Sequence, residues 1–512
     1  MNNSFYISTP IYYVNDKPHI GHAYTTILAD VIARFYRQLN YDTFFLTGLD
    51  EHGQKVQEAA SNRKVEPQDH CNEMAPRFTE LWEKLHISND DFIRTTEERH
   101  KISAKNIWNI LEKKGEIYLS KYSGWYSVSD EAFYTNDEVE EIDNKKISKS
   151  SGSLVEWVEE ESYFFKLSKW QKPLLKFYAE NSDFILPKSR KNEVMSFVKG
   201  GLKDLSVSRK SFKWGIKVPS NKDHVMYVWL DALTNYLSAL NYPDIDNILY
   251  KSFWPASVHI IGKDILRFHA VYWPAFLLAA DIKPPQRVYG HGWILSGDEK
   301  MSKSKGNILD PLEIIKIYGL DPLRYYLIKE VSFGNDGNIS EDKLESCINS
   351  DLANNYGNLC QRVISFNEKN INLKIPILGK FNDDDISVLS VYEKEYNNLV
   401  KYIDNQDINS YINFIVEQLF AANKYFNDQE PWKKKDNMIR LNTIVYVALE
   451  LIRKITILLY PIIPQSSLKV LKVFEINEDQ INFQSIKKHD LNKQGNTINK
   501  IGILFKKIEK ND

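Results

Sequence analysis

The first 46 residues of the chain alternate between a strand, a helix and a second strand. Residues 5–14 and 43–46 are apolar and aromatic runs typical of buried strands, and residues 20–39 between them repeat apolar side chains with a helical period. Two parallel strands need such a crossover, because a tight turn joins only antiparallel neighbours. This order predicts an α/β fold built on a doubly wound, parallel, Rossmann-like sheet.

Strand signals return after residue 220, at 225–229, 258–261 and 287–295, so an insert interrupts the sheet domain. In the insert, Tyr, Trp and Ser alternate with acidic residues, which predicts a small β-rich module. Beyond it, helical periodicity runs on to residue 460 and predicts an all-α bundle. The stripe that begins this bundle comprises Leu344, Ile348, Leu352, Tyr356, Leu359 and Val363.

These changes of pattern divide the chain into six expected segments. A closing strand or helix over residues 501–508 is expected to pack back onto the bundle. The segments are 1–118 and 220–295 for the two halves of the sheet domain, 119–219 for the insert, 296–345 for a loop-containing connection, 346–470 for the bundle and 471–512 for the tail.

Composition limits the class of protein. Apolar residues make up 43% of the chain and charged residues 26%, which is typical of a globular protein, and no apolar run approaches the ~20 residues that cross a membrane. The three cysteines, Cys71, Cys347 and Cys360, have no CxxC spacing. Because a strand-like run starts almost at the first residue, we expect no leader. We expect a cytoplasmic protein without a membrane partner. Because the net charge is −2, any nucleic-acid partner would have to bind at local basic patches.

Two histidines mark the junction of the first strand and the first helix. His19, Ile20, Gly21 and His22 stand where a helix N-terminus offers N–H groups to anions. The two imidazoles, three residues apart, share one helix face, and Gly21 leaves room for a nucleobase near the backbone. Neither a GxxxxGK[ST] loop nor a GxGxxG loop is present. A surface histidine pair or an HxxH metal site is the alternative interpretation.

A short basic segment far along the chain complements this junction. Lys300, Met301, Ser302, Lys303 and Ser304 form a cationic stretch between two glycines, although a solvated loop has the same composition. In this order, the two motifs resemble the ATP-binding signatures of class I aminoacyl-tRNA synthetases. The resemblance implies that His19, Gly21, His22 and residues 300–304 bind ATP, that Mg²⁺ accompanies it, and that His19, His22, Lys300 and Lys303 act in catalysis.

Further blocks resemble the methionyl-tRNA synthetase family over essentially the whole chain. They are residues 9–13, 48–53, 229–232, 261–265 and 268–274. The resemblance implies that Asp50 binds the α-ammonium group of methionine. Tyr13 and His269 are expected to direct donors at the sulfur, and core packing is the alternative for each aromatic residue. The other implied methionine-binding residues are Ile11, Trp229, Ala232, Leu233, Tyr236, Ile265, Phe268 and Trp273.

The bundle carries the expected RNA contacts. Asn358 and Arg362 lie one helical turn apart in a segment that resembles the anticodon-reading helix of this family, and Pro431 and Trp432 match its anticodon-stacking position. Packing is the alternative role for a lone tryptophan on a bundle. The implied partner is methionine tRNA, initiator and elongator, with L-methionine and ATP as substrates.

The chain also departs from the family pattern. Residues 119–169 contain no cysteine or histidine, so we predict that the insert has no zinc knuckle. We expect no further tRNA-binding domain after the bundle, which favours a monomer. Two alternatives stay open: another class I synthetase without an editing domain, such as one for cysteine, and a catalytically inactive tRNA-binding relative.

Overall fold

The protein is described from a computed structural model, which covers residues 3–127, 132–142, 145–149, 151–296, 299–300, 310–331, 334–489 and 494–509. Its contacts form two compact units: residues 1–18 with 43–291, and residues 19–42 with 292–512. Among the described residues, no helix is both long and apolar enough to cross a membrane.

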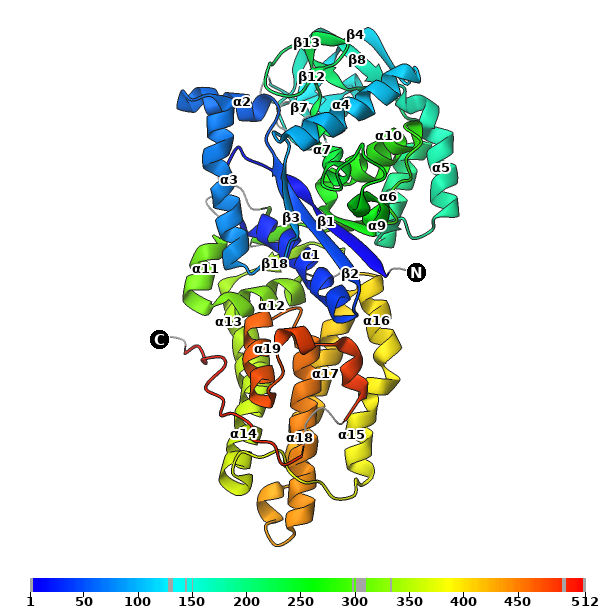
Figure 1. The fold of residues 1–512 in the computed structure, drawn as a ribbon. Coiled ribbons are helices and arrows are strands. Elements are labelled where there is room, and N and C mark those ends of the chain that lie inside the picture. Colours follow the sequence, from blue (N-terminus) through cyan, green and yellow to red (C-terminus); the bar gives the residue numbers. More distant parts are fainter. Residues whose placement is uncertain are drawn as a thin grey trace. The chain divides into compact units, whose positions relative to one another are not determined.

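The first unit is built on a six-stranded sheet (Figure 1). Every pairing whose register is described in this sheet is parallel, as the alternation of strand and helix predicts. The α/β fold class is therefore confirmed. In spatial order the strands are β3 (Asp91–Arg94), β2 (Asp42–Asp50), β1 (Ser4–Tyr13), β14 (Val258–Gly262), β15 (Val288–His291) and β9 (Ile185–Leu186).

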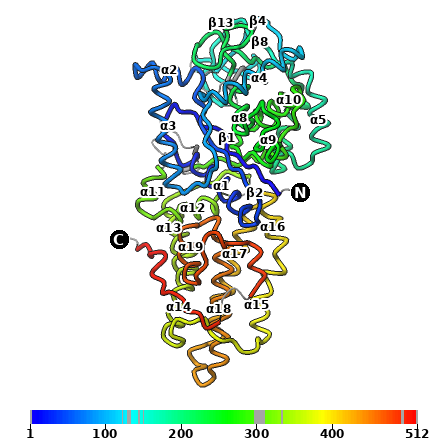
Figure 2. Tube along the Cα trace, viewed as in Figure 1, coloured from blue at the N-terminus to red at the C-terminus, as the bar shows by residue number. Residues whose placement is uncertain are grey.

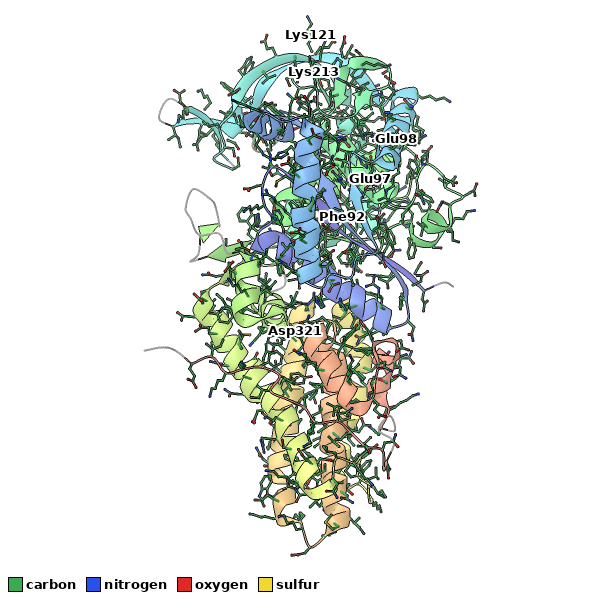
Figure 3. All side chains as sticks on the ribbon, turned by 60° about the vertical axis from the view of Figure 1, so that its left-hand side comes forward. Phe92, Glu97, Glu98, Lys121, Lys213 and Asp321 are labelled. Atoms are coloured by element: carbon green, nitrogen blue, oxygen red, sulfur yellow. The ribbon has the colours of Figure 1, made fainter. Side chains whose placement is uncertain are left out.

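Helices of this unit contact the sheet and one another, as α6 does with β9 and α8 with β3. Helix α4 starts with two acidic residues, Glu97 as N-cap and Glu98 in the first turn, which complement the positive end of its dipole (Figure 3). The helices are α2 (Gln54–Arg63), α3 (Pro67–Lys84), α4 (Glu98–Lys113), α5 (Gln171–Glu180), α6 (Lys188–Lys199), α7 (Val228–Leu233), α8 (Asn235–Ser238), α9 (Ile248–Phe253) and α10 (Trp273–Ala279).

The insert is β-rich only in its first part. A long antiparallel pairing of β4 with β8 forms its frame, and Trp125 meets Trp157 edge to face across that pair at 5.3 Å between ring centroids. Helices α5 and α6 follow, and β9 joins the main sheet. The strands of the insert are β4 (Ile117–Ser127), β5 (Ala132–Tyr134), β6 (Val139–Ile142), β7 (Lys145–Ser148), β8 (Glu156–Phe165), β10 (Leu205–Ser206), β11 (Ser208–Arg209) and β12 (Lys217–Val218).

Two strand predictions need correction. The strand expected at 225–229 ends at Met226 as β13 (Asn221–Met226), which pairs with β11 and β12 outside the main sheet, and α7 follows it. A short apolar run fits a buried strand or a buried helix equally well. The strand expected at 287–295 is two strands, β15 and β16 (Ile294–Ser296). They separate at Gly292, where a Cβ would lie 1.9 Å from the carbonyl oxygen of Asn335.

The second unit joins helix α1 (Ile20–Gln38) to the C-terminal helices. Figure 2 traces these C-terminal helices through the green to red part of the chain, and α17 and α18 run side by side (Figure 1). The helices are α11 (Pro311–Tyr318), α12 (Leu320–Glu330), α13 (Glu341–Cys347), α14 (Asn358–Ile371), α15 (Asp383–Lys394), α16 (Tyr396–Asp404), α17 (Ile408–Asp428), α18 (Met438–Leu459) and α19 (Pro464–Leu471).

The predicted apolar stripe of the bundle is buried from Leu344 to Val363, and a π-helical segment, Ile348–Gly357, joins α13 to α14. A small sheet of β17 (Glu299–Lys300), β16 (Ile294–Ser296) and β18 (Gly337–Ile339) belongs to the same unit. The expected strand or helix at 501–508 is absent, because these residues are described and lack regular structure. They contact the π-helical segment through Phe505, 6.4 Å from the Tyr356 ring.

Candidate active site

His19 and His22 form a compact cap at the start of α1. The His19 Nδ1 accepts a hydrogen bond from the Gly21 N–H, and the His22 Nδ1 accepts one from the His19 N–H, both at 3.1 Å. The two rings stack with 3.9 Å between centroids. This reciprocal pattern is a capping box made by two imidazoles. The structure therefore brings together the two histidines that the sequence predicts to act together.

The cap determines where the histidine protons lie. Since each Nδ1 accepts a backbone N–H, the proton of each neutral ring belongs on Nε2. Burial, together with the neighbouring His19 ring, lowers the pKa of His22 well below its usual value, so His22 is neutral at physiological pH. The first turn of α1 contains no acidic residue, so its positive dipole end is not neutralised there. Two N–H donors beside that dipole suit a phosphate group.

Gly21 serves a purpose that the sequence does not reveal. A Cβ at this position would lie 2.9 Å from Cε1 and 3.1 Å from Nδ1 of His19. The ring of His19 occupies the space of the missing side chain, and only glycine leaves that space open. Gly21 thus permits the cap itself, whatever its role toward a nucleobase.

The basic segment is described only at its first residue. Lys300 ends β17, and its backbone pairs with Leu295 of β16. Met301, Ser302, Lys303 and Ser304 lie outside the described residues, so their predicted role in binding ATP stays a prediction.

The predicted methionine-binding residues of β1 and β2 lie where a parallel sheet binds ligands. Between β1 and β14 the strand order reverses, and such a switch point opens a crevice at the carboxyl ends of the strands. Ile11 and Tyr13 are at that end of β1, and the buried Asp50 is the last residue of the neighbouring β2. Thr9 links the two strands through a 2.8 Å hydrogen bond to Thr47.

Aromatic side chains pack together in the core against which Ile11 and Tyr13 lie. Trp229, on α7, stacks on Phe268 with 3.4 Å between ring centroids and 11° between planes. Tyr236 and Trp273 are buried, with 6.1 Å between their ring centroids. Ala232 and Leu233 are also buried on α7. Ile11, Tyr13, Ile265 and Phe268 are partly buried and pack against the core that contains Trp229, Leu233, Tyr236 and Trp273.

His269 does not offer a donor to a ligand sulfur, contrary to the expectation. Its Nδ1 donates to the carbonyl oxygen of Ile265 at 3.0 Å, and its Nε2 accepts from the Tyr236 hydroxyl at 2.7 Å. Burial lowers the pKa of His269 to about 4, which keeps the ring neutral and its Nε2 an acceptor. His269 therefore orients the Tyr236 hydroxyl.

At the end of the bundle, two of the expected anticodon contacts meet at one ring. The Arg362 guanidinium lies 5.6 Å from the centroid of Phe426 and donates to Asn427 Oδ1 at 2.6 Å. Trp432, 41% exposed, meets the same phenylalanine edge to face at 6.2 Å. Pro431 is buried and begins the 3₁₀ turn that holds Trp432, and Asn358 is exposed one turn before Arg362.

Two clusters of side chains in the structure have no counterpart among the residues predicted from the sequence. Phe426 and Asn427 lie in the last turn of α17, just before Pro431. In the sequence, only the end of the helical period marks their position. The second cluster is buried in the first unit and centres on Asp231, which lies between His52 and His100. Asp231 and His52 stand inside the blocks of family resemblance, but nothing in the sequence points to His100.

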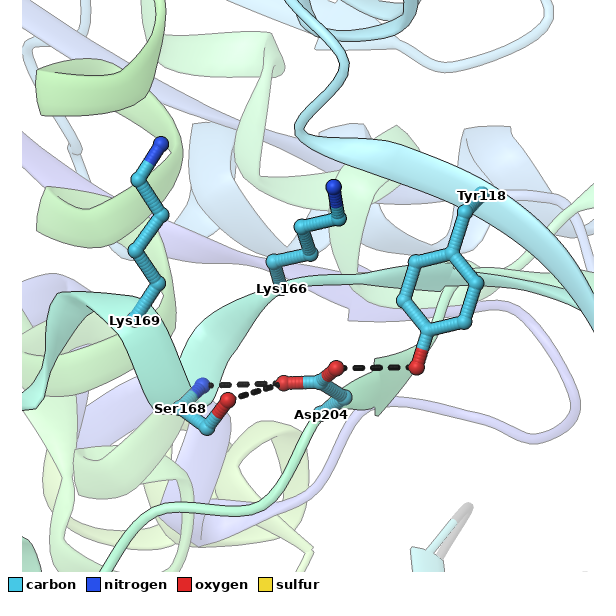
Figure 4. Close-up of a pocket in the computed structure, with 5 residues that line it drawn as sticks. All are labelled: Tyr118, Lys166, Ser168, Lys169 and Asp204. Atoms are coloured by element: carbon cyan, nitrogen blue, oxygen red, sulfur yellow. Dashed lines mark hydrogen bonds between the residues drawn. The ribbon is translucent and has the colours of Figure 1, made fainter.

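A separate cavity of about 570 Å³ lies on the insert (Figure 4). Its walls include Lys166 and Lys169, together with Asp204, which accepts hydrogen bonds from the Ser168 hydroxyl at 2.5 Å and from Tyr118 at 2.8 Å. None of these residues belongs to the predicted sites, and the Asp204 carboxylate already has its partners within the wall.

Comparison with known proteins places the chain in a family. The family model of tRNA synthetases class I (M) matches residues 5–364, well over half of the chain. The chain belongs to the methionyl-tRNA synthetase family. A second model, the anticodon binding domain of methionyl tRNA ligase, matches residues 375–512, which include Pro431 and Trp432. Asn358 and Arg362 fall within the first match. As a family member the chain is an aminoacyl-tRNA synthetase, as the sequence motifs predict.

Relatives match along nearly the full length. A methionine–tRNA ligase of Rickettsia conorii is 48% identical over 99% of this chain and 100% of its own, and one of Brucella suis is 46% identical over 94% of each. The solved structure of Mycobacterium tuberculosis methionyl-tRNA synthetase in complex with methionyl-adenylate is similar with a TM-score of 0.96. It is 43% identical and covers 98% of this chain and 99% of that one.

Proposed function

We propose that the protein activates L-methionine with ATP and transfers the methionyl group to the 3′ end of methionine tRNA, initiator and elongator. The observation that carries the proposal is the aromatic wall formed by Trp229, Phe268 and the Tyr236–His269 pair, in a chain that matches methionine–tRNA ligases over its full length. The complex of the Mycobacterium tuberculosis relative with methionyl-adenylate supports the same intermediate.

In the first step, a carboxylate oxygen of methionine bonds to the α-phosphorus of ATP while the bond to the pyrophosphate oxygen breaks. The reaction requires positioning and stabilisation of the negative charge on the phosphates. His19 and His22 supply Nε2–H donors for this purpose beside the α1 dipole. Lys300 and Lys303 are proposed to add positive charge, with Met301, Ser302 and Ser304 completing the ATP contacts.

Mg²⁺ is proposed to enter with ATP. The donors at the start of α1 are imidazole and backbone N–H groups, which suit phosphate oxygens, whereas Mg²⁺ prefers carboxylate or phosphate oxygens. The triphosphate of ATP would therefore hold the ion, which would neutralise phosphate charge there.

Methionine selection is proposed to combine one charged contact, from the Asp50 carboxylate, with an apolar surface. Asp50 would bind the α-ammonium group, since a carboxylate–ammonium bond is a strong anchor. The thioether would lie against the aromatic wall, where each sulfur–aromatic contact contributes roughly 0.3 to 1.5 kcal/mol. Since His269 is committed to Tyr236 and Ile265, it would shape the wall rather than bind the sulfur directly.

In the second step, the terminal ribose hydroxyl of tRNA attacks the methionyl carbonyl carbon, and AMP leaves. Recognition of the tRNA is proposed to use the bundle end, where Arg362 and Trp432 flank Phe426. Unpaired anticodon bases can stack on an exposed indole and bond to a guanidinium. Asn358 and Pro431 are proposed to support this surface.

The protein is further proposed to work as a cytoplasmic monomer without zinc. In the insert, the β4–β8 ladder and the Trp125–Trp157 contact support the frame where a zinc knuckle would otherwise act. Light scattering of the purified chain tests the monomer, and metal analysis of active protein tests the absence of zinc. One equivalent of zinc per chain, or a stable dimer, would contradict these two parts.

Amino-acid-dependent ATP–pyrophosphate exchange, measured with each proteinogenic amino acid, tests the function. We expect exchange with methionine and methionylation of CAU-anticodon tRNA. Exchange with cysteine or isoleucine but not methionine would reject the proposal in favour of another class I synthetase. Binding of tRNA without exchange for any amino acid would identify an inactive relative.

A further inference from the structure

Asp231 is a buried carboxylate held between two histidines. Its Oδ2 lies 2.7 Å from His52 Nδ1, and its Oδ1 lies 2.7 Å from His100 Nε2. Asp231 is 1% exposed and His100 is fully buried. Burial alone would raise the pKa of the Asp231 carboxyl, but the two histidines hold that pKa well below its usual range. The group is therefore an anion with both oxygens engaged in short hydrogen bonds.

This carboxylate is on α7, the helix that carries Trp229 of the aromatic wall. Helix α7 has only six residues and no side-chain hydrogen bond at its N-cap. A helix this short is unstable by itself, so tertiary contacts determine its place. Trp229, Ala232 and Leu233 are on the same helix, and Trp229 stacks on Phe268. The anchoring of Asp231 therefore decides where those side chains stand.

The two histidines come from two different parts of the first unit. His52 is two residues beyond Asp50, at the end of β2. His100 is on α4, and its Nδ1 lies 3.1 Å from the Ser238 hydroxyl of α8. Through His52, Asp231 joins the aromatic wall to the strand end that carries Asp50.

We infer that Asp231 is a positioning residue: its bonds to His52 and His100 set the gap between the ammonium-binding Asp50 and the side-chain wall on α7, and hence the length of amino acid that the site accepts. This inference rests on the proposed function. The inference explains how the site discriminates between methionine and shorter analogues. Buried hydrogen bonds suit that role, because they resist the small shifts that a flexible wall would permit.

The Asp231→Asn variant tests the inference in ATP–pyrophosphate exchange. We expect the KM for methionine to rise about tenfold or more, while the KM for ATP stays unchanged and kcat falls by no more than about threefold. We also expect the preference for methionine over homocysteine, which lacks the terminal methyl group, to fall by about fivefold or more. An unchanged methionine KM, or a parallel loss in all parameters, would overturn the inference.

His52 offers a second test if Asp231→Asn fails to fold. His52→Asn keeps an N–H donor close to the position of Nδ1, and His52→Leu removes it. We expect the asparagine variant to approach the wild-type KM for methionine and the leucine variant to match Asp231→Asn. Equal KM values for the two variants would contradict the inference.

Asp385→Asn is the matched control. Asp385 is also a fully buried carboxylate, paired with Arg440 at 2.5 Å in the bundle. Its loss should lower thermal stability without changing the methionine KM or the preference over homocysteine. Failure of the proposed function itself would be distinguishable, since the wild-type protein would then show no methionine-dependent exchange at all.

Discussion

A single missing side chain at residue 21 lets His19 fold over the start of α1. A Cβ at residue 21 would lie only 2.9 Å from Cε1 of the His19 ring, and the Nδ1 of that ring accepts the Gly21 N–H. The stack with His22 then holds both Nε2–H groups beside the positive end of the helix. At this scale, the chemistry depends on the fit of two rings and one backbone position.

Gly21→Ala should displace the His19 ring. Because misplacement by about 1 Å costs up to ~100-fold in rate, we expect exchange activity to fall about 10- to 100-fold. Steady-state exchange at varied ATP measures the effect. Gly502→Ala is the control, since a Cβ at Gly502 meets nothing within 4 Å. Normal activity in Gly21→Ala would show that the cap is dispensable.

At the scale of elements, α18 joins the bundle to the segment after α19. Lys454 of α18 is fully buried, and its ammonium donates to the carbonyl oxygen of Ile486. Burial is the main cause that lowers the pKa of Lys454 to about 7; Glu450 opposes the shift, and Arg453 adds to it. The folded protein thus binds this proton more weakly than the unfolded chain does.

The lowered pKa of Lys454 predicts that the stability of the protein depends on pH. Between about pH 7 and 10.5 the unfolded chain keeps the Lys454 proton that the folded protein has released, so this residue makes stability rise with pH. Below pH 7 its destabilising contribution is complete and constant. In Lys454→Met, the rise of the unfolding free energy with pH should disappear. This rise is worth a few kcal/mol, on the order of 1.4 kcal/mol for each unit of pKa shift. Thermal unfolding of both proteins across pH 6–10.5 measures it, and parallel curves would contradict it.

A second prediction at this scale concerns Trp432, at the end of the bundle. Trp432→Ala removes the half-exposed indole that contacts Phe426, and loss of base stacking typically costs about 1–3 kcal/mol. We expect kcat/KM for tRNA to fall about 5- to 150-fold while ATP–pyrophosphate exchange stays normal. Phe420→Ala, on α17 and 64% exposed, is the control and should charge normally. Normal charging by Trp432→Ala would remove this residue from the RNA surface.

At the scale of the whole molecule, α1 belongs to the same compact unit as the bundle. Asp30 of α1 forms a buried ion pair with Arg324 of α12 at 2.6 Å. Farther along α1, Gln38 donates to the Ile457 carbonyl oxygen at 2.9 Å, and Arg34 lies 5.8 Å from the Tyr460 ring centroid. The helix that presents His19 and His22 is therefore packed as part of the C-terminal unit.

Truncation after residue 345 should therefore abolish exchange, although that reaction needs no anticodon. The shortened chain keeps His19, His22 and α12 but loses α17 and α18, whose residues also contact α1. The apolar surface exposed by this loss should destabilise α1. Exchange assays and circular dichroism of the truncated chain test this. Full activity of the shortened chain would show that the removed helices are not needed to hold α1.

Local patterns were sufficient where a strand, a helix and a strand follow one another or where a helical period is long. The apolar runs of β1 and β2 around α1, and the stripe from Leu344 to Val363, are such patterns, so residue order alone predicts them. The strand predicted at 225–229 is wrong beyond Met226, because a short apolar run fits a strand and a helix equally well. The prediction of a strand or helix at 501–508 is wrong, because the few contacts of this tail, such as Phe505 with Tyr356, give no regular backbone pairing.

The sequence by itself determined the family, the parallel-sheet fold and the identity of the candidate site residues, because short motifs and periodicity are properties of residue order. Only the tertiary structure decided how those residues work. It turned His269 toward Ile265 and Tyr236, placed His19 in the space beside Gly21, and enclosed Asp231 between His52 and His100. Such contacts join residues up to 179 positions apart, and their geometry arises from packing rather than from local order.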